Sequence, residues 1–78
     1  MSAVTYRKRC NKLGIKIGEV GEIWEHKSDI KCLILQIVSP PSESESGEYT
    51  VMHLDTGNIR MLLSDITERY GDGWRFVA

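Results

Sequence analysis

The fold is decided by residues 48–63, which read EYTVMHLDTGNIRMLL. Two runs of branched and large apolar residues flank the polar sequence Asp55-Thr56-Gly57-Asn58. Such runs are typical of strands, and a glycine in the turn can adopt the positive φ that a tight hairpin requires. The stretch therefore predicts a β-hairpin with strands over residues 48–54 and 59–63.

The sequence before the hairpin predicts two further strands. Residues 19–25 are rich in branched and aromatic residues, and the glycines beside them argue against a helix. Residues 30–38 form an almost continuous apolar run that ends at Pro40-Pro41. Such a run predicts a strongly bent strand that is covered on both faces, as in a closed barrel. The sequence PPSESESG at 40–47 predicts a solvated loop.

The sequence after the hairpin predicts a helical turn and a last strand. Ser64 precedes a single turn over residues 65–69, and a glycine-rich turn leads into a strand over residues 74–77. This order of elements resembles the small SH3-like barrels, the architecture shared by Tudor and KOW modules. The resemblance covers residues 15–78 and is carried by residues 18–25, 51–60 and 63–66. It implies a mainly β, five-stranded SH3-like barrel with one short helical turn before the last strand.

Length and composition allow one small globular domain. The chain has 78 residues, of which 41% are hydrophobic and 27% charged, which is ordinary for a globular protein. Its longest apolar runs are far shorter than the roughly 20 residues that span a bilayer, so we expect a cytoplasmic protein with no membrane contact. Two cysteines are too few for a disulfide scaffold. We expect Cys10 and Cys32 to be reduced, although a bridge between them stays open.

The N-terminal segment differs from the rest in charge. We divide the chain into a basic arm (1–14), with one helical turn ending at Gly14, and a barrel domain (15–78). The first 16 residues contain no acid and five basic residues, which are Arg7, Lys8, Arg9, Lys12 and Lys16. The other 5 basic residues stand against all 11 acids. The arm therefore suits a polyanion or an acidic surface, or it folds back on Glu19, Glu22 and Glu25 of its own domain. Its apolar residues look too dispersed for a shared core.

Motifs for catalysis or metal binding are missing from the sequence. It contains no glycine-rich phosphate loop, no His-Glu-x-x-His and no Gly-x-Ser-x-Gly. The spacings of Cys10, His26, Cys32 and His53 match no zinc pattern. We therefore expect a protein that is not an enzyme and that needs no metal or cofactor.

The resemblance also implies a binding function. In SH3-like modules the ligand usually meets exposed aromatic residues between the long loops and the turn before the last strand. Trp24, Tyr49 and Tyr70 fall in the matching segments, so the resemblance implies that they form a recognition patch for a protein partner. The alternative is a KOW-type or Tudor-like nucleic-acid module that uses the basic arm.

The chain is also similar to short phage-encoded proteins, with their glycine-rich opening strand and tight hairpin. This similarity implies an inhibitor or modifier that occupies a surface of a host complex in the host cytoplasm. An exposed edge strand over residues 74–77 leaves a homo-oligomer open.

Overall fold

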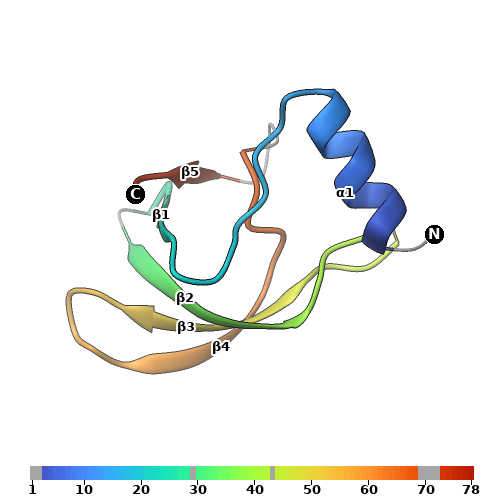
Figure 1. Cartoon of the computed structure of the whole chain (residues 1–78). Helices are drawn as coiled ribbons and strands as arrows, with labels where there is room; N and C mark the ends of the chain where they lie inside the picture. Colours follow the sequence, from blue (N-terminus) through green and yellow to red (C-terminus); the bar gives the residue numbers. More distant parts are fainter. Residues whose placement is uncertain (1–2, 29, 43, 69–72) are drawn as a thin grey trace.

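The computed structural model describes residues 3–28, 30–42, 44–68 and 73–78, and it confirms a mainly β fold (Figure 1). The elements are α1 (Ala3–Lys12), β1 (Ile23–His26), β2 (Lys31–Ser39), β3 (Glu48–His53), β4 (Ile59–Leu63) and β5 (Trp74–Phe76). The strands form one antiparallel sheet in the order β4-β3-β2-β1-β5. The sheet curls as a barrel does, but it is not closed, because β4 and β5 do not pair with each other in the described parts of the chain.

The predicted hairpin is confirmed as β3 and β4. The His53 N–H donates to the Asn58 carbonyl at 2.8 Å, and the Gly57 N–H donates to the His53 carbonyl at 2.7 Å. Gly57 has a φ of 76°, which a residue with a Cβ adopts only with strain. The turn therefore fixes the register of the hairpin.

The long apolar strand β2 is bent by two irregularities. Its pairing with β3 shifts between Ile34 and Gln36 and again between Ile37 and Ser39. Such bulges bend a strand and increase its twist. The prediction that this strand is covered on both faces is wrong, because Leu35 and Val38 are exposed.

The predicted helical turn before the last strand is wrong for residues 65–68, and position 69 lies outside the described residues. The segment is extended instead, and Thr67 forms an isolated antiparallel bridge with Ile17. The Gly18 N–H donates to the Ile66 carbonyl at 2.7 Å, and the Glu68 N–H donates to the Lys16 carbonyl at 3.0 Å. These pairings satisfy backbone groups that a helical turn would use otherwise.

The N-terminal segment forms a helix of 10 residues, more than the single turn expected. Tyr6 and Cys10 lie four residues apart on one face of α1, and only 2% and 3% of their surfaces are exposed. They pack with Ile17 in a second, smaller apolar cluster. The expectation that this segment's apolar residues are too dispersed to share a core is therefore wrong.

The last helical residue of α1 is Lys12, and Gly14 terminates the helix as predicted. Gly14 has a φ of 73°. The Gly14 N–H donates to the Asn11 carbonyl at 3.2 Å, and the Ile15 N–H donates to the Cys10 carbonyl at 2.8 Å. This is the Schellman arrangement, and the packing of Ile15 against the Cys10 cluster completes it.

The main core lies inside the curled sheet. Its buried members are Trp24, Cys32, Ile34, Tyr49, Val51, Ile66 and Trp74. Cys10 and Cys32 are both buried and free, so they are not bridged. The helix that the structure describes is neither long nor apolar enough to cross a membrane.

Candidate functional site

The aromatic residues expected to form the recognition patch do not form one. Trp24 and Tyr49 are 0% exposed. Trp24 packs edge-to-face on Phe76, with 5.7 Å between the ring centroids. Tyr70, the third candidate, lies outside the described residues. The expectation that Trp24 and Tyr49 meet a ligand is wrong, because strand pairing turns both rings into the core.

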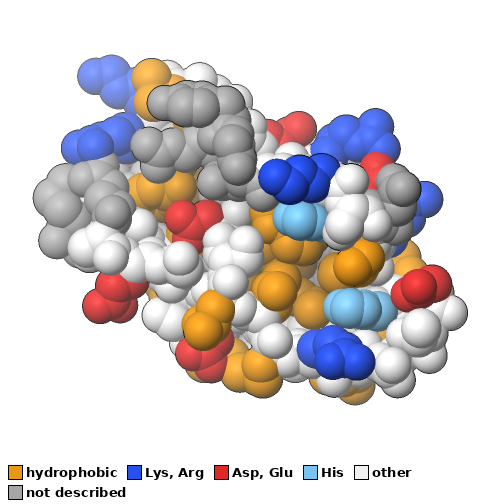
Figure 2. All heavy atoms as spheres, turned by 180° about the vertical axis from the view of Figure 1, so that it is seen from behind, with side chains coloured by type: hydrophobic (Ala, Val, Ile, Leu, Met, Phe, Trp, Pro, Cys, Tyr) orange, Lys and Arg blue, Asp and Glu red, His pale blue; other side chains and the backbone are white. Residues whose placement is uncertain are grey.

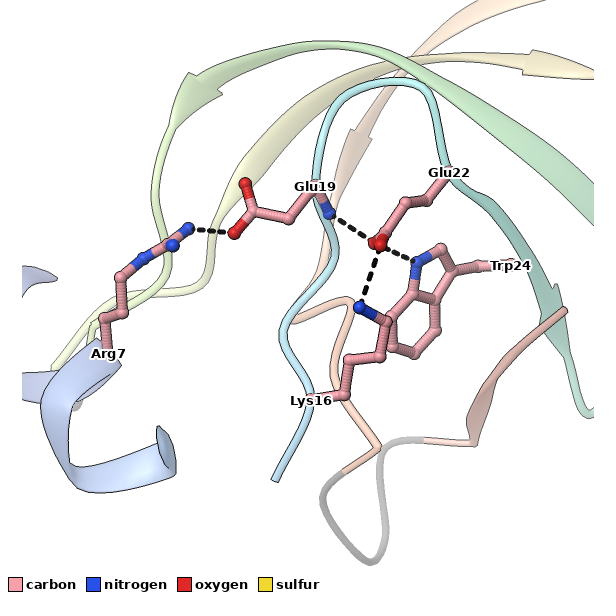
Figure 3. A network of polar contacts seen from close by, with 5 residues as sticks. All are labelled: Arg7, Lys16, Glu19, Glu22 and Trp24. Atoms are coloured by element: carbon pink, nitrogen blue, oxygen red, sulfur yellow. Dashed lines mark hydrogen bonds and ion pairs between the residues drawn. The ribbon is translucent and has the colours of Figure 1, made fainter. Parts of the chain in front are cut away.

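The basic residues of the N-terminal segment partly fold back on the acids that follow them. Arg7 pairs with Glu19 at 2.6 Å, and Lys16 pairs with Glu22 at 2.8 Å (Figure 3). Both were named as residues for a polyanion. These contacts match the alternative in which the arm folds back, whereas Glu25, the third acid named, pairs with Arg75 of β5.

The remaining basic side chains of α1 face solvent. Lys8, Arg9 and Lys12 are exposed, and no ion pair joins Lys8 or Lys12 to another described residue. Lys8 and Lys12 lie on the helix face opposite the buried Tyr6 and Cys10. This face keeps a positive charge that the structure does not use internally.

Glu22 is the centre of the polar network in Figure 3. One carboxylate oxygen of Glu22 accepts the Glu19 N–H at 2.8 Å and the Trp24 indole N–H at 3.2 Å (Figure 3). Burial opposes the negative charge, but the hydrogen bonds from Lys16, the Glu19 backbone and Trp24 outweigh it and lower the pKa of Glu22. The network therefore ties the segment after α1 to β1, and it is structural.

A groove opens at the end of the sheet that lies away from α1. It has a volume of about 290 Å³. Its lining comes from five segments of the fold and consists of His26, Ile30, Cys32, Val51, His53, Arg60, Met61, Leu62, Leu63, Ser64 and Trp74. Figure 2 shows apolar side chains gathered around the two histidines, with Lys or Arg side chains close by. The groove is the space between β4 on one side and the end of β1 and start of β5 on the other.

The polar groups of the groove are basic or neutral. Arg60, His26 and His53 line it, and no Asp or Glu does. The His26 ring meets Trp74 edge-to-face at 4.9 Å, and its Nδ1 lies 2.9 Å from the Ser28 hydroxyl. The Trp74 indole N–H donates to the Ser64 hydroxyl at 3.0 Å, which fixes the wall of the groove near the end of β4.

Three of the four residues considered for zinc come together here. His26, Cys32 and His53 line the same groove, whereas Cys10 lies in the α1 cluster. No group of three or more ligand-type side chains among the described residues could hold a metal ion. Burial, with the charge of Asp55, raises the pKa of the Cys32 thiol, so this cysteine stays a neutral apolar group.

No pattern in the sequence indicates this groove as a whole. Its lining comes from β1, β2, β3, β4 and β5 and the loops beside them, and only the sheet order brings these segments together. A partial signal was present in the hairpin, where Arg60 is the only charged residue of β4. The chain matches no family model, no curated protein and no solved structure.

Proposed function

We propose that this chain is a non-enzymatic binding module whose apolar groove binds a protein partner. The observation that carries the proposal is the groove itself, which is about 290 Å³ in volume and apolar in most of its lining. A mostly apolar hollow with a few convergent polar groups is the usual form of a binding site. Its size suits one or two side chains of a partner, and its rim offers His26, His53 and Arg60 for orientation.

The resemblance to SH3-like modules and to short phage-encoded proteins adds two proposals. The barrel-like sheet is a small interaction module of that type, and it works in the cytoplasm by occupying a surface of a host complex. We place the proposed binding site in the groove and not at the expected aromatic residues, because Trp24 and Tyr49 are buried.

Nucleic-acid binding is the second candidate. It is favoured by the exposed basic face of α1, with Lys8 and Lys12. Arg7 and Lys16 contribute less to it, because Glu19 and Glu22 neutralise them. Each phosphate neutralised contributes a slope of about −0.9 to log K against log salt, so these two cations predict a slope of about −2.

The two candidates are tested with a matched pair of variants. Ile30→Glu places a carboxylate in the groove. Leu13→Glu is the control, because it replaces an exposed apolar residue after α1 that does not line the groove. Immobilised chains are used to capture proteins from a nuclease-treated lysate, and the captured proteins are compared by mass spectrometry. We expect Ile30→Glu to lose a set of proteins that the parent chain and Leu13→Glu both retain. An identical set for all three chains contradicts the proposal.

The nucleic-acid candidate has its own measurement. Anisotropy titrations with single- and double-stranded oligonucleotides are made for the parent chain and for a Lys8→Glu, Lys12→Glu variant. Salt-dependent binding that this variant abolishes and Ile30→Glu preserves would favour the second candidate.

A further inference from the structure

The free edge of β4 carries backbone groups that no described residue satisfies. In an antiparallel pair, hydrogen-bonded residue pairs alternate with pairs that are not hydrogen-bonded. The His53 N–H donates to the Asn58 carbonyl, and the Ser64 N–H donates to the Gly47 carbonyl. These two contacts mark hydrogen-bonded pairs at both ends of the hairpin. By alternation, Arg60 and Leu62 also form hydrogen-bonded pairs, with Val51 and Tyr49 of β3. The N–H and C=O groups of Ile59, Met61 and Leu63 therefore point away from β3, toward the open edge.

This edge has little of the usual protection against strand pairing, because Arg60 is the one charged residue of β4 and no proline or bulge interrupts the strand. Exposed edge strands are normally blunted by charges, prolines or bulges. Ile59, Met61 and Leu63 are instead apolar and 63%, 59% and 73% exposed. The pairing of β4 with β3 is regular over all of its 5 residues. The edge is therefore regular, apolar on its outer face and able to accept a further strand.

The side chains of an added strand would alternate between the two faces of the sheet. Residues opposite Ile59, Met61 and Leu63 would extend the outer face, whereas those opposite Arg60 and Leu62 would point into the groove. Leu62 is half-buried against the core, and Arg60 lies opposite Val51 on the same concave side. An incoming segment thus reaches the groove with two side chains that lie two positions apart.

We propose that the occupant of the groove is an extended segment of a partner protein that adds a strand to the β4 edge, with an apolar residue opposite Leu62 and an Asp or Glu opposite Arg60. This inference rests on the proposed function and names the chemistry of the partner. The acid follows from charge complementarity, because Arg60, His26 and His53 line the groove and no acid does. The apolar residue follows from the mostly apolar lining.

A second copy of the chain is the competing occupant, and it fits less well. An antiparallel pairing of two β4 strands about a twofold axis at Met61 would place Arg60 opposite Leu62 of the other copy. Neither Arg60 would then meet a carboxylate, because β4 itself contains no acid. The complementary charge therefore favours a different protein.

The test begins with a displayed library of random octapeptides selected on the intact chain. We expect the selected peptides to contain an apolar residue two positions from an Asp or Glu. The tightest one is then synthesised in two forms, each methylated on alternate backbone nitrogens. One form should bind at least tenfold more weakly than the parent peptide, and the other should bind within threefold of it, because only one set of N–H groups faces β4.

Variants of the chain supply the matching evidence. The Met61 N–H points to the open edge, so Met61→Pro removes a docking donor and leaves the bonds to β3 in place. We expect Met61→Pro to weaken the peptide at least tenfold and Met61→Thr to leave its affinity within threefold. Arg60→Glu should reverse the preference, so that a peptide with Lys in place of the acid binds better. The methylated peptides keep the test valid if Met61→Pro does not fold.

Each contrary result has a distinct meaning. Binding that both methylated forms retain, but that Ile30→Glu abolishes, overturns strand addition and leaves the groove as the binding site. A selection that yields no peptide sensitive to Ile30→Glu overturns the proposed function and this inference together. Selected peptides rich in Lys or Arg overturn the acidic partner. Sedimentation that shows a dimer of the parent chain, lost in Met61→Pro, overturns the choice of a different protein in favour of a second copy.

Discussion

The two ends of β2 differ in how the chain covers them, and the difference separates structure from function. At the C-terminal end, α1 packs its buried side chains beside Ile37 and Pro41, and the space left there is only about 20 Å³. That volume holds about one water molecule. At the N-terminal end, Cys32 lines the open groove of about 290 Å³. We name these the helix end and the groove end.

The charges follow the same division. At the helix end, Arg7 and Lys16 are neutralised by nearby glutamates, whereas Lys8 and Lys12 face solvent on the side of α1 away from the packed residues. At the groove end, Arg60 forms no ion pair with a described residue, and no acid lines the groove beside it. Contacts within the chain at the helix end stabilise the fold. The apolar and basic groups left without partners among the described residues at the groove end are available to a partner. The comparison predicts that equal changes have unequal effects at the two ends.

The largest contrast is expected between Tyr6→Ala and Ile30→Ala. Tyr6 is buried at the helix end, and truncation of a buried aromatic side chain costs about 3 kcal/mol or more of the free energy of unfolding. Ile30 is exposed at the groove end, so its truncation should cost less than about 1 kcal/mol. Urea unfolding followed by tryptophan fluorescence measures both.

Because small domains have only a few kcal/mol in reserve, Tyr6→Ala can leave too little folded protein to measure. Tyr6→Leu then gives a smaller loss on the same scale. Equal losses for the Tyr6 and Ile30 variants would mean that α1 does not contribute to the core and that the helix end is not the closed one.

The hairpin could be predicted because its information is local. The sequence Asp55-Thr56-Gly57-Asn58 specifies a turn, and the predicted strand over residues 59–63 coincides with β4. The five strands and their order along the chain could be predicted from such local signals, whereas their order in the sheet could not. The helical turn expected at residues 65–68 failed because distant backbone groups of Lys16 and Gly18 pair with this segment, and no local pattern contains that contact.

The length of α1 was missed for a similar reason. Tyr6 and Cys10 have the spacing of one helix turn, but four basic residues dominate the segment that they share. Two apolar residues predict burial only when a partner such as Ile17 is known to lie beneath them. The partner comes from the tertiary fold, so the sequence pattern favoured an arm.

The burial of Tyr49 could have been predicted from the sequence, whereas the burial of Trp24 could not. Glu48 and Thr50 share one face of β3, and this alternation could have placed Tyr49 with Val51 on the inner face. Trp24 had no such signal, because the strand around it was predicted to begin at Glu19 and begins at Ile23. The groove could not be predicted at all, since the register of four strand pairs determines its lining.

A smaller contrast is expected at alkaline pH. Burial raises the pKa of Tyr49 to about 12, although the Ile66 backbone opposes this effect. The hydroxyl makes no hydrogen bond of standard geometry with the described residues. Between pH 10 and 12 the unfolded chain has lost this proton and the folded chain still holds it. This contribution to stability is therefore complete below pH 10 and is lost at about 1.4 kcal/mol per pH unit between pH 10 and pH 12.

Urea titrations at several alkaline pH values test this dependence, with Tyr49→Phe as the matched control. The parent chain should lose stability more steeply than the variant, because the variant has no phenol to ionise. Parallel curves would show that solvent reaches the Tyr49 hydroxyl and that this part of the core is less closed than the burial of the ring indicates.

The smallest effect is expected on the outer face of β4, where Ile59→Thr should change the free energy of unfolding by less than about 0.5 kcal/mol. Ile59 is exposed, and threonine keeps the branched shape that suits a strand. Val51→Thr introduces a hydroxyl on the neighbouring strand at a fully buried position and should cost about 2 kcal/mol.

The Ile59→Thr experiment also addresses why the apolar row of β4 is present. If Ile59→Thr leaves stability unchanged, the row at Ile59, Met61 and Leu63 is not needed by the folded monomer, and its exposed surface is available for a partner strand. A loss near that of Val51→Thr would mean instead that the outer face of β4 packs on another part of the chain in solution. The apolar row would then be covered within the monomer, and its exposure would no longer favour a partner strand at β4.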